Sequence, residues 1–143
     1  MQKVTSDKIR NIVLLSHGGA GKSSLAESML FESGGLTRLG SIDDGTSTSD
    51  YEDEEIKRQV SIQTAILPCA WNGHKINVID TPGYADFRGE TVSGVRVADA
   101  AVIVISAPSG VEVGTRQLWK LVEEIDIPKI VFVNKIYREN SNE

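Results

Sequence analysis

The sequence predicts an α/β doubly wound fold, in which helices cover both faces of a mostly parallel sheet. Three features predict it: an apolar run that enters a glycine-rich loop and then a helix, a tight turn between two strand-like runs, and two later apolar runs separated by an amphipathic helix. Alternating strands and helices are typical of parallel sheets. The 143 residues match the usual length of one domain.

The first strand is expected over residues 9–15, a β-branched and apolar run that ends at a glycine-rich loop. A helix should follow this loop, because Leu25, Met29 and Leu30 recur at helical spacing before a glycine pair at 34–35. The loop is therefore expected to lie between a buried strand and the start of a helix.

The segment 36–60 is polar, acidic and rich in glycine, serine and threonine, with no sustained apolar period. Loops longer than about 12 to 15 residues in a compact domain are usually functional or disordered. We therefore expect a long loop here, either a moving switch or an unstructured insertion.

The dipeptide Asn72-Gly73 separates the apolar runs 61–71 and 74–80. This dipeptide fits a type I′ turn, so the two runs are expected to pair as an antiparallel hairpin.

Residues 100–106 and 129–133 are apolar on both faces, which is typical of parallel strands covered by helices on both sides. Between them, residues 112–126 form an amphipathic pattern that ends before Pro128, so a helix is expected there. A shorter helix is expected over 87–98.

The formal net charge of −5 argues against direct nucleic-acid binding by this acidic chain, because phosphate neutralisation requires clustered Lys and Arg. No apolar run has the length of a membrane span, so no membrane association is expected. The single cysteine, Cys69, excludes an intramolecular disulfide and favours a reducing, cytoplasmic location. Cys69 and His74 have no ligand partners in the sequence, and Trp71 and Trp119 are expected to bury apolar area.

The strongest chemical signal is SHGGAGKS at 16–23, which is close to a Walker A loop. Glycines let backbone N–H groups surround phosphate oxygens at a helix N-terminus. Lys22 is expected to reach the β- and γ-phosphates and Ser23 to bind Mg²⁺. The strict motif begins with glycine, whereas this chain has Ser16, so a glycine-rich turn before an ordinary helix is the alternative. The residues expected to contact the phosphates are His17, Gly18, Gly19, Ala20, Gly21, Lys22, Ser23 and Ser24.

Asp80 and Gly83 belong to a D-T-P-G sequence directly after the second hairpin strand, at the strand end where α/β sheets bind ligands. Asp80 could hold Mg²⁺ through a water, and the Gly83 N–H could sense a γ-phosphate. An Asp-x-x-Gly sequence alone is a common turn, and it gains its meaning from the preceding phosphate loop.

Asn134 and Lys135 end the last predicted strand, where a guanine-binding N-K-x-D motif would lie. Asn134 is expected to buttress the phosphate loop and Lys135 to cover the base with its aliphatic stem. The fourth position is Tyr137, so the acid that reads guanine is missing.

Several stretches together resemble the G domain of bacterial elongation factor G-like translational GTPases, which have a P-loop GTPase fold. The matching stretches are NIVLLSHGGAGKSSLAESML, SDYEDEEIKRQVSI, WNGHKINVIDTPGYADFRGE, APSGVEVGTRQLWK and VNK. The resemblance covers almost the whole chain. It implies GTP or GDP and Mg²⁺ as ligands, hydrolysis of GTP, and a parent protein that acts on the ribosome. Residues 1–143 would then be a GTP-binding domain, incomplete at its C-terminal end, with the further domains of the parent absent.

The resemblance also implies roles for single residues. Ser61 stands where the family has a threonine that binds Mg²⁺ and the γ-phosphate, so Ser23, Ser61 and Asp80 form the expected metal set. Tyr84 stands where the family has a histidine that orients the attacking water, and it is the expected catalytic residue together with Lys22. Gly19 replaces an aspartate that is found in many members.

Three hypotheses stay open from the sequence. The first is a GTPase switch that acts on the ribosome, although the ribosomal step it would serve depends on other domains. The second, motivated by Tyr84 and Tyr137, is a nucleotide-binding module with little or no turnover. The third is a P-loop ATPase or kinase that uses Lys22 on ATP.

Overall fold

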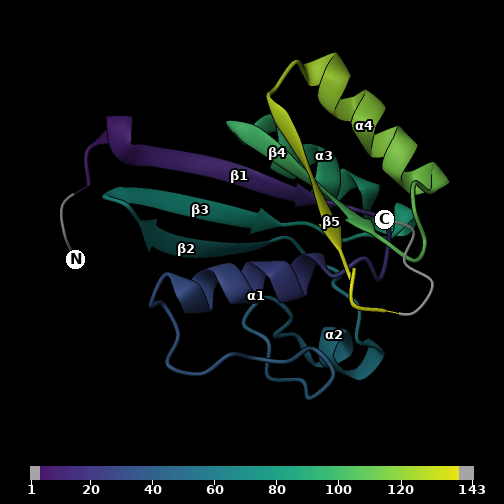
Figure 1. The fold of residues 1–143 in the computed structure, drawn as a ribbon, viewed down its shortest axis with the longest axis horizontal. Helices are drawn as coiled ribbons and strands as arrows, with labels where there is room; N and C mark the ends of the chain where they lie inside the picture. Colours follow the sequence, from purple (N-terminus) through teal and green to yellow (C-terminus); the bar gives the residue numbers. More distant parts are fainter. Residues whose placement is uncertain (1–3, 139–143) are drawn as a thin grey trace.

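A computed structural model describes residues 4–138 and shows a central mixed sheet (Figure 1). In the described part of the chain the sheet has five strands in the order β2-β3-β1-β4-β5. All neighbouring strands are parallel except β2 and β3, which are antiparallel. The strands are β1 (Ile9–Leu15), β2 (Ala65–Trp71), β3 (His74–Asp80), β4 (Ala100–Ser106) and β5 (Lys129–Asn134). The predicted mostly parallel sheet with one antiparallel hairpin is confirmed.

Helices lie on both faces of the sheet, with α1 on one face and α3 and α4 on the other (Figure 1). The helices are α1 (Lys22–Glu32), α2 (Asp53–Arg58), α3 (Arg88–Arg96) and α4 (Val113–Ile125). Short 3-10 turns precede β1 and α3 at Ser6–Lys8 and Ala85–Phe87. The helices predicted after the glycine loop and before Pro128 are both present.

The core consists of two apolar clusters, one on each face of the sheet. One cluster joins β1, β3 and β4 to α3 and α4, and its buried members are Val13, Leu15, Ile79, Val95, Ala101, Ile103 and Val122. The other joins β1, β2 and β3 to α1, and its buried members are Leu14, Ala26, Leu30, Leu67, Cys69 and Val78. Cys69 is therefore a packing residue.

The register of the parallel strands brings their carboxyl ends to one edge. Leu14 of β1 lies beside Asp80 of β3, and Ser106 of β4 lies beside Asn134 of β5. The segments that follow β1, β3 and β5 consequently meet at this edge, although they are far apart in the sequence.

The hairpin turn follows from the dipeptide between β2 and β3. Asn72 and Gly73 have φ angles of 45° and 75°, and a type I′ turn requires positive φ at both central residues.

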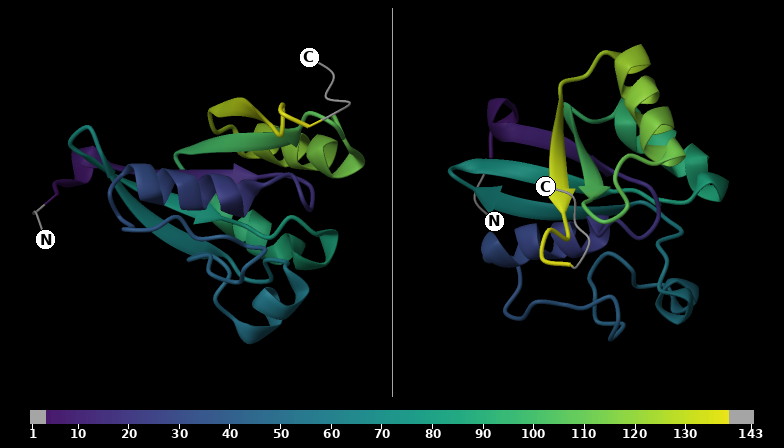
Figure 2. Two further views of the ribbon diagram at one scale, coloured as in Figure 1. Left: turned by 60° about the horizontal axis from the view of Figure 1, so that its bottom comes forward. Right: turned by 45° about the vertical axis from the view of Figure 1, so that its right-hand side comes forward.

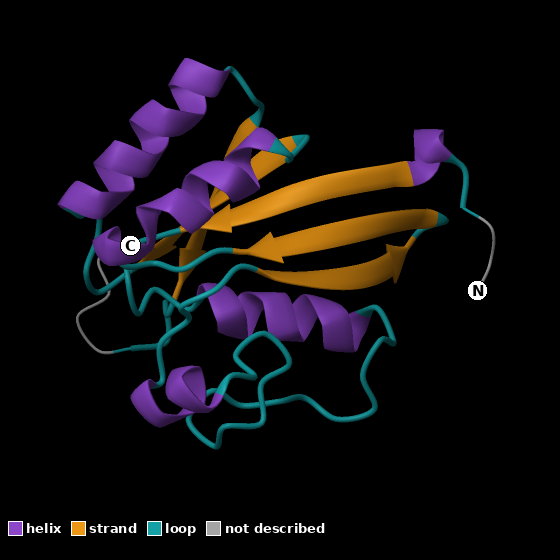
Figure 3. Cartoon of the chain, turned by 180° about the vertical axis from the view of Figure 1, so that it is seen from behind, coloured by secondary structure: helices purple, strands orange, loops and turns teal. Residues whose placement is uncertain are grey.

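The segment between α1 and β2 is a long loop interrupted only by α2, as Figure 3 shows by its colouring. Both views in Figure 2 place this segment alongside α1. The sequence prediction missed α2, because a helix of six residues is too short to show an apolar period. A capping box between Glu52 and Glu55, acidic residues in the first turn and basic residues in the last stabilise it locally.

The prediction that both faces of the last strand are covered is wrong for the described structure. β5 forms an edge of the sheet, and Ile130, Val131, Phe132 and Val133 are 64%, 47%, 40% and 51% exposed. β4, which has a strand on each side, is largely buried as predicted.

The prediction that both tryptophans bury apolar area is also wrong. Trp71 is 58% exposed, because it ends the edge strand β2 at the tip of the hairpin. Trp119 is 38% exposed on α4, where its indole N–H donates to the Glu123 carboxylate (2.7 Å) and the Lys129 ammonium lies 4.9 Å from its ring centre.

Candidate functional site

The glycine-rich loop leads from β1 into α1 and lines a cavity of about 440 Å³. This volume lies in the usual range of small-molecule sites. Gly19 and Gly21 have φ angles of 77° and 95°, a left-handed conformation that glycine adopts without steric cost, and a Cβ atom at Gly21 would also clash with the Asn134 side chain. The first turn of α1 follows directly and presents its free N–H groups and the positive end of its dipole at this edge.

Lys22 is buried below this loop, with only 6% of its surface exposed. Its ammonium donates a hydrogen bond to the Ser16 hydroxyl (3.0 Å). Burial lowers the pKa of Lys22, and the nearby Asp80 and Asp50 carboxylates oppose this shift. Ser16, which departs from the strict motif, therefore holds the lysine in place.

Asp80 ends β3 and is 1% exposed, and neither of its carboxylate oxygens has a hydrogen-bond partner among the described residues. Burial raises the pKa of Asp80 to about 6, although the Lys22 charge and the Ser23 hydroxyl act against this shift. Buried carboxylates are normally paired or bind metals, so the two free oxygens fit a bound cation.

Two hydroxyl groups complete the expected metal set. The oxygen atoms of Ser23 and Ser61 lie 3.1 Å apart, although the two residues are far apart in the sequence. Hydroxyl and carboxylate oxygens suit Mg²⁺, which usually keeps several waters and binds through few protein groups. Among the described residues, no group of three or more His, Cys, Asp or Glu side chains is placed so that it could hold a metal ion.

Asp50 also lines the cavity, and sequence reasoning missed it. It is 4% exposed; burial raises its pKa, and the Ser61 hydroxyl lowers it. Asp50 begins an acidic run, DYEDEE, which is typical of a solvated loop. Nothing in that local pattern marks its first member as buried.

Gly83 packs directly against the phosphate loop. A Cβ atom at Gly83 would lie 2.7 Å from the Lys22 ammonium and 3.0 Å from the His17 carbonyl oxygen, so a side chain does not fit. The D-T-P-G segment thus reaches the residue that is expected to bind the γ-phosphate.

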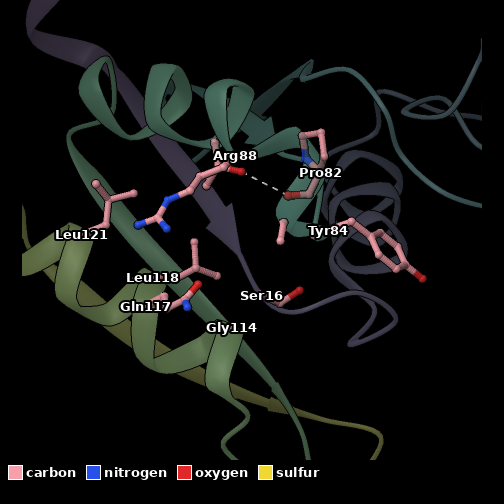
Figure 4. A pocket seen from close by; sticks show the side chains of 11 residues that line it. Ser16, Pro82, Tyr84, Arg88, Gly114, Gln117, Leu118 and Leu121 are labelled. Carbon is pink, nitrogen blue, oxygen red and sulfur yellow. Dashed lines mark hydrogen bonds between the residues drawn. The ribbon is translucent and has the colours of Figure 1, made fainter.

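Tyr84 lies over Gly18 and is 48% exposed. A Cβ atom at Gly18 would fall 2.7–3.0 Å from three atoms of the tyrosine ring, so the ring occupies the space that a side chain there would need. Tyr84 lines both this cavity and a smaller cleft of about 70 Å³ between α3 and α4. In Figure 4 its ring points away from Leu118 and Leu121, which line that cleft.

Asn134 and Lys135 contact the phosphate loop from the end of β5. The Asn134 amide donates to the Ala20 carbonyl oxygen (3.0 Å), and the Lys135 ammonium donates to the Gly19 carbonyl oxygen (2.6 Å). Tyr137 lines the same cavity but is 79% exposed. The arrangement therefore joins the last strand to the loop, with Tyr137 at the outer rim.

Three expected phosphate contacts do not present side chains to the cavity centre. The His17 ring is buried, with Nδ1 2.8 Å from the Gly18 carbonyl oxygen and 3.4 Å from the Glu112 carboxylate near the start of α4. Ala20 is fully buried, and Ser24 is exposed at the rim. His17 and Ala20 can therefore contact a phosphate only through their backbone groups.

No helix in the described range 4–138 combines the length and the apolar character needed to cross a membrane.

Comparison with known proteins shows the family of the chain. Residues 7–143 match the family described as elongation factor Tu GTP binding domain. The chain is 42% identical over 138 residues to mitochondrial ribosome-releasing factor 2 of Candida dubliniensis, covering 96% of this chain and 17% of that protein. It is 40% identical over 133 residues to elongation factor G of Thermotoga neapolitana, covering 93% of this chain and 19% of that protein. Because yeast mitochondrial and bacterial proteins both match, the relatives do not assign the chain to the bacterial group.

Solved structures give the same result. A crystal structure of a protein from Thermus thermophilus superposes with a TM-score of 0.87 at 37% identity, over 90% of this chain and 20% of that chain. The translation elongation factor SelB of Methanococcus maripaludis, solved with the GTP analogue GppNHp, superposes with a TM-score of 0.67 at 21% identity, over 88% and 22% of the two chains, and supports the fold alone. The chain belongs to the elongation factor Tu GTP-binding domain family, and within it the chain is similar to elongation factor G.

Proposed function

We propose that this chain binds GTP together with Mg²⁺ and hydrolyses the GTP to GDP and phosphate, and that the hydrolysis drives a conformational switch of a larger protein on the ribosome. The observation that carries the proposal is that Lys22, Ser23 and Ser61 line one cavity with the glycine-rich loop, while the buried Asp80 carboxylate lies close enough to Lys22 and Ser23 for both to lower its pKa. These residues come from α1, the long loop and the end of β3, so the fold assembles a site that no single segment contains.

The chain's own groups divide the work. The N–H groups of the loop from His17 to Ser24 and the Lys22 ammonium would hold the phosphates. Ser23, Ser61 and Asp80 would hold Mg²⁺, which neutralises charge on the β- and γ-phosphates when it is bound.

Tyr84 would orient the attacking water through its phenol hydroxyl, which can both donate and accept a hydrogen bond. The ring must leave its position over Gly18 or hold the water from there. Because Tyr84 stands where the family has a histidine, and its phenol would orient the attacking water, we expect GTP hydrolysis to be slow.

The ribosome is a partner of the whole protein in this proposal. The chain spans only 16% to 19% of the length of the curated relatives it matches, so further domains would convert the switch into movement. The names of the relatives refer to ribosome release and to elongation, and either step is compatible with this domain. We propose a cytoplasmic location and no direct nucleic-acid contact by this acidic chain.

Titration of the chain with fluorescent GDP, with and without Mg²⁺ and in competition with ADP, tests the proposal. We expect Mg²⁺ to strengthen binding and GDP to compete better than ADP. Lys22→Met should weaken binding by about a hundredfold or more, since hydrogen bonds to charged groups contribute about 1.5–3 kcal/mol each. Unchanged binding by a folded Lys22→Met protein would remove the phosphate loop from the proposal.

A second candidate is a nucleotide-binding module with little turnover, which the departures at Tyr84 and Tyr137 favour. Single-turnover GTP hydrolysis, measured with and without ribosomes, separates the two. Binding without phosphate release in either condition would select this second candidate, and a preference for ATP would select a P-loop ATPase instead.

A further inference from the structure

Two buried carboxylates hold the long loop between α1 and β2 in its position. This loop delivers Asp50 and Ser61 to the phosphate site, so whatever fixes the loop also fixes these two side chains. The two carboxylates are Glu27 and Glu55, which are 2% and 1% exposed.

Glu55 accepts hydrogen bonds from other residues of the same loop. One of its oxygens accepts hydrogen bonds from the Ile62 N–H (2.8 Å) and the Gln63 N–H (3.0 Å), and the other accepts from the Glu52 N–H (3.2 Å). All three partners belong to the region that Glu55 itself occupies. Glu55 therefore fixes the chain directly after Ser61 relative to α2.

Glu27 joins the loop to α1. One carboxylate oxygen accepts from the Thr48 N–H (3.0 Å), and the other accepts from the Thr48 hydroxyl (3.0 Å). Gly40 packs against the same carboxylate so closely that a Cβ atom there would clash with Glu27 and with the Thr46 carbonyl oxygen. Two separate parts of the loop therefore meet one side chain of α1.

Charges on and near α1 act on Asp50 in both directions. Burial raises the pKa of Asp50, and the negative charges of Glu55 and Glu27 raise it further because like charges repel, whereas the Ser61 hydroxyl and the Lys22 ammonium lower it. The Thr48 hydrogen bonds to Glu27 add a direct link to α1, and Thr48 lies two residues before Asp50.

We propose that Glu27 is a positioning residue, which latches the loop to α1 through Thr48 and so places Asp50 and Ser61 at the Mg²⁺ site. This inference rests on the proposed function, because it assigns Glu27 to the same site. Glu27 lies on α1, which also carries Lys22 and Ser23, so the latch fixes the loop to the element that starts the phosphate site.

Glu27→Gln tests the latch with little change of shape. The amide replaces one acceptor oxygen by a donor, which cannot accept a hydrogen bond from Thr48. We expect the ratio of GDP Kd values without and with Mg²⁺ to fall by about tenfold, since one charged hydrogen bond is lost, while the Mg²⁺-free Kd changes less than about twofold. Glu32→Gln, an exposed glutamate on the same helix, is the matched control and should keep the parent ratio.

Amide hydrogen exchange of nucleotide-free protein gives a second readout that does not depend on binding. The amides of residues 46–50 should exchange about tenfold faster in Glu27→Gln than in the parent, and at the parent rate in Glu32→Gln. If the parent shows no Mg²⁺-dependent guanine binding, the proposed function fails, and the exchange rates still decide whether Glu27 holds the loop.

Thr48 variants test the latch from the loop side, where misfolding of the core is not a concern because Thr48 is exposed. Thr48→Val removes the hydroxyl donor, so it should lower the ratio of GDP Kd values without and with Mg²⁺ and should speed amide exchange of residues 46–50. Thr48→Ser retains the hydroxyl and should keep both at the parent values. Parent-like ratios and exchange in Glu27→Gln and Thr48→Val would overturn the inference. An equal loss of affinity with and without Mg²⁺ would also overturn it, because Glu27 would then support the fold alone.

Discussion

At the scale of single residues, two pairs shape the site: the oppositely charged Lys22 and Asp80, and Gly18 with the Tyr84 ring. Lys22 and Asp80 are both almost completely buried, and their opposite charges partly compensate each other across the phosphate site. The Tyr84 ring occupies the space that a side chain at position 18 would fill, so it packs directly on Gly18.

Gly18→Ala should change hydrolysis more than binding. The added methyl group would meet the Tyr84 ring, and the half-exposed ring can move aside at less cost than the backbone. We expect single-turnover GTP hydrolysis to change by roughly tenfold or more, and the GDP Kd by less than about threefold. The double variant Gly18→Ala/Tyr84→Ala should hydrolyse at the Tyr84→Ala rate, and additive effects would show that the two positions act separately.

Tyr137→Asp should increase the preference for guanine. An aspartate accepts two hydrogen bonds from the guanine base, and adenine lacks both donors. Because position 137 is 79% exposed, solvent weakens such bonds, and we expect the low end of their range, about tenfold to a hundredfold in GDP affinity. Calorimetry with GDP and ADP measures the change, and equal gains for both nucleotides would place this residue away from the base.

At the scale of elements, two glycines with open space around them show how backbone conformation decides the effect of one substitution. Gly73 in the hairpin turn has a φ of 75°, whereas Gly89 lies in the first turn of α3 without a positive φ. Apart from the chain neighbours and the backbone of the same helix, no atom lies within 4 Å of a Cβ built at either position.

Gly73→Ala should therefore destabilise the domain by about 1 kcal/mol, because alanine resists positive φ. Gly89→Ala should stabilise it by about 0.5–1 kcal/mol, since alanine is the better helix former. Urea unfolding of both variants gives the two free energies of unfolding side by side. Changes of the same sign would contradict the assigned turn or the helix.

For the whole molecule, the buried Asp80 carboxylate makes stability depend on pH when Mg²⁺ is absent. Its pKa is raised in the folded state to about 6 from 3.8, so folding favours the protonated form. Its stabilising contribution is fully present below about pH 4 and is lost as the pH rises through 6. At neutral pH the ionised carboxylate then costs up to about 3 kcal/mol.

Asp80→Asn should raise the free energy of unfolding in EDTA at pH 7.5 by about 1–3 kcal/mol. The lower value is expected if the buried Lys22 ammonium is destabilised by the loss of the opposite charge on Asp80. The gain over the parent should shrink as the pH falls toward 5. Urea unfolding at several pH values measures it, and a pH-independent difference between variant and parent would contradict the buried charge. The same variant should lose the strengthening of GDP binding by Mg²⁺.

The local sequence by itself determined several loops, turns and helices of this protein. The glycine loop before α1, the Asn72-Gly73 turn and the amphipathic helix before Pro128 each depend on backbone preferences and side-chain periods that a short segment carries alone. The chain's membership of a translational GTPase family was likewise evident from stretches that the sequence displays directly.

Only the tertiary structure decided which polar side chains leave the solvent. Asp50, Glu27 and Glu55 belong to segments that are typical of solvated surface, yet each is buried. Glu27 accepts hydrogen bonds from Thr48 of the long loop, and Glu55 accepts them from Ile62 and Gln63, which the loop brings back onto α2. The reverse holds for Trp71 and for the apolar residues of β5, which stay exposed because edge strands lack neighbours. Burial depends on what packs against a residue, and that is settled by contacts between segments that the local sequence does not contain.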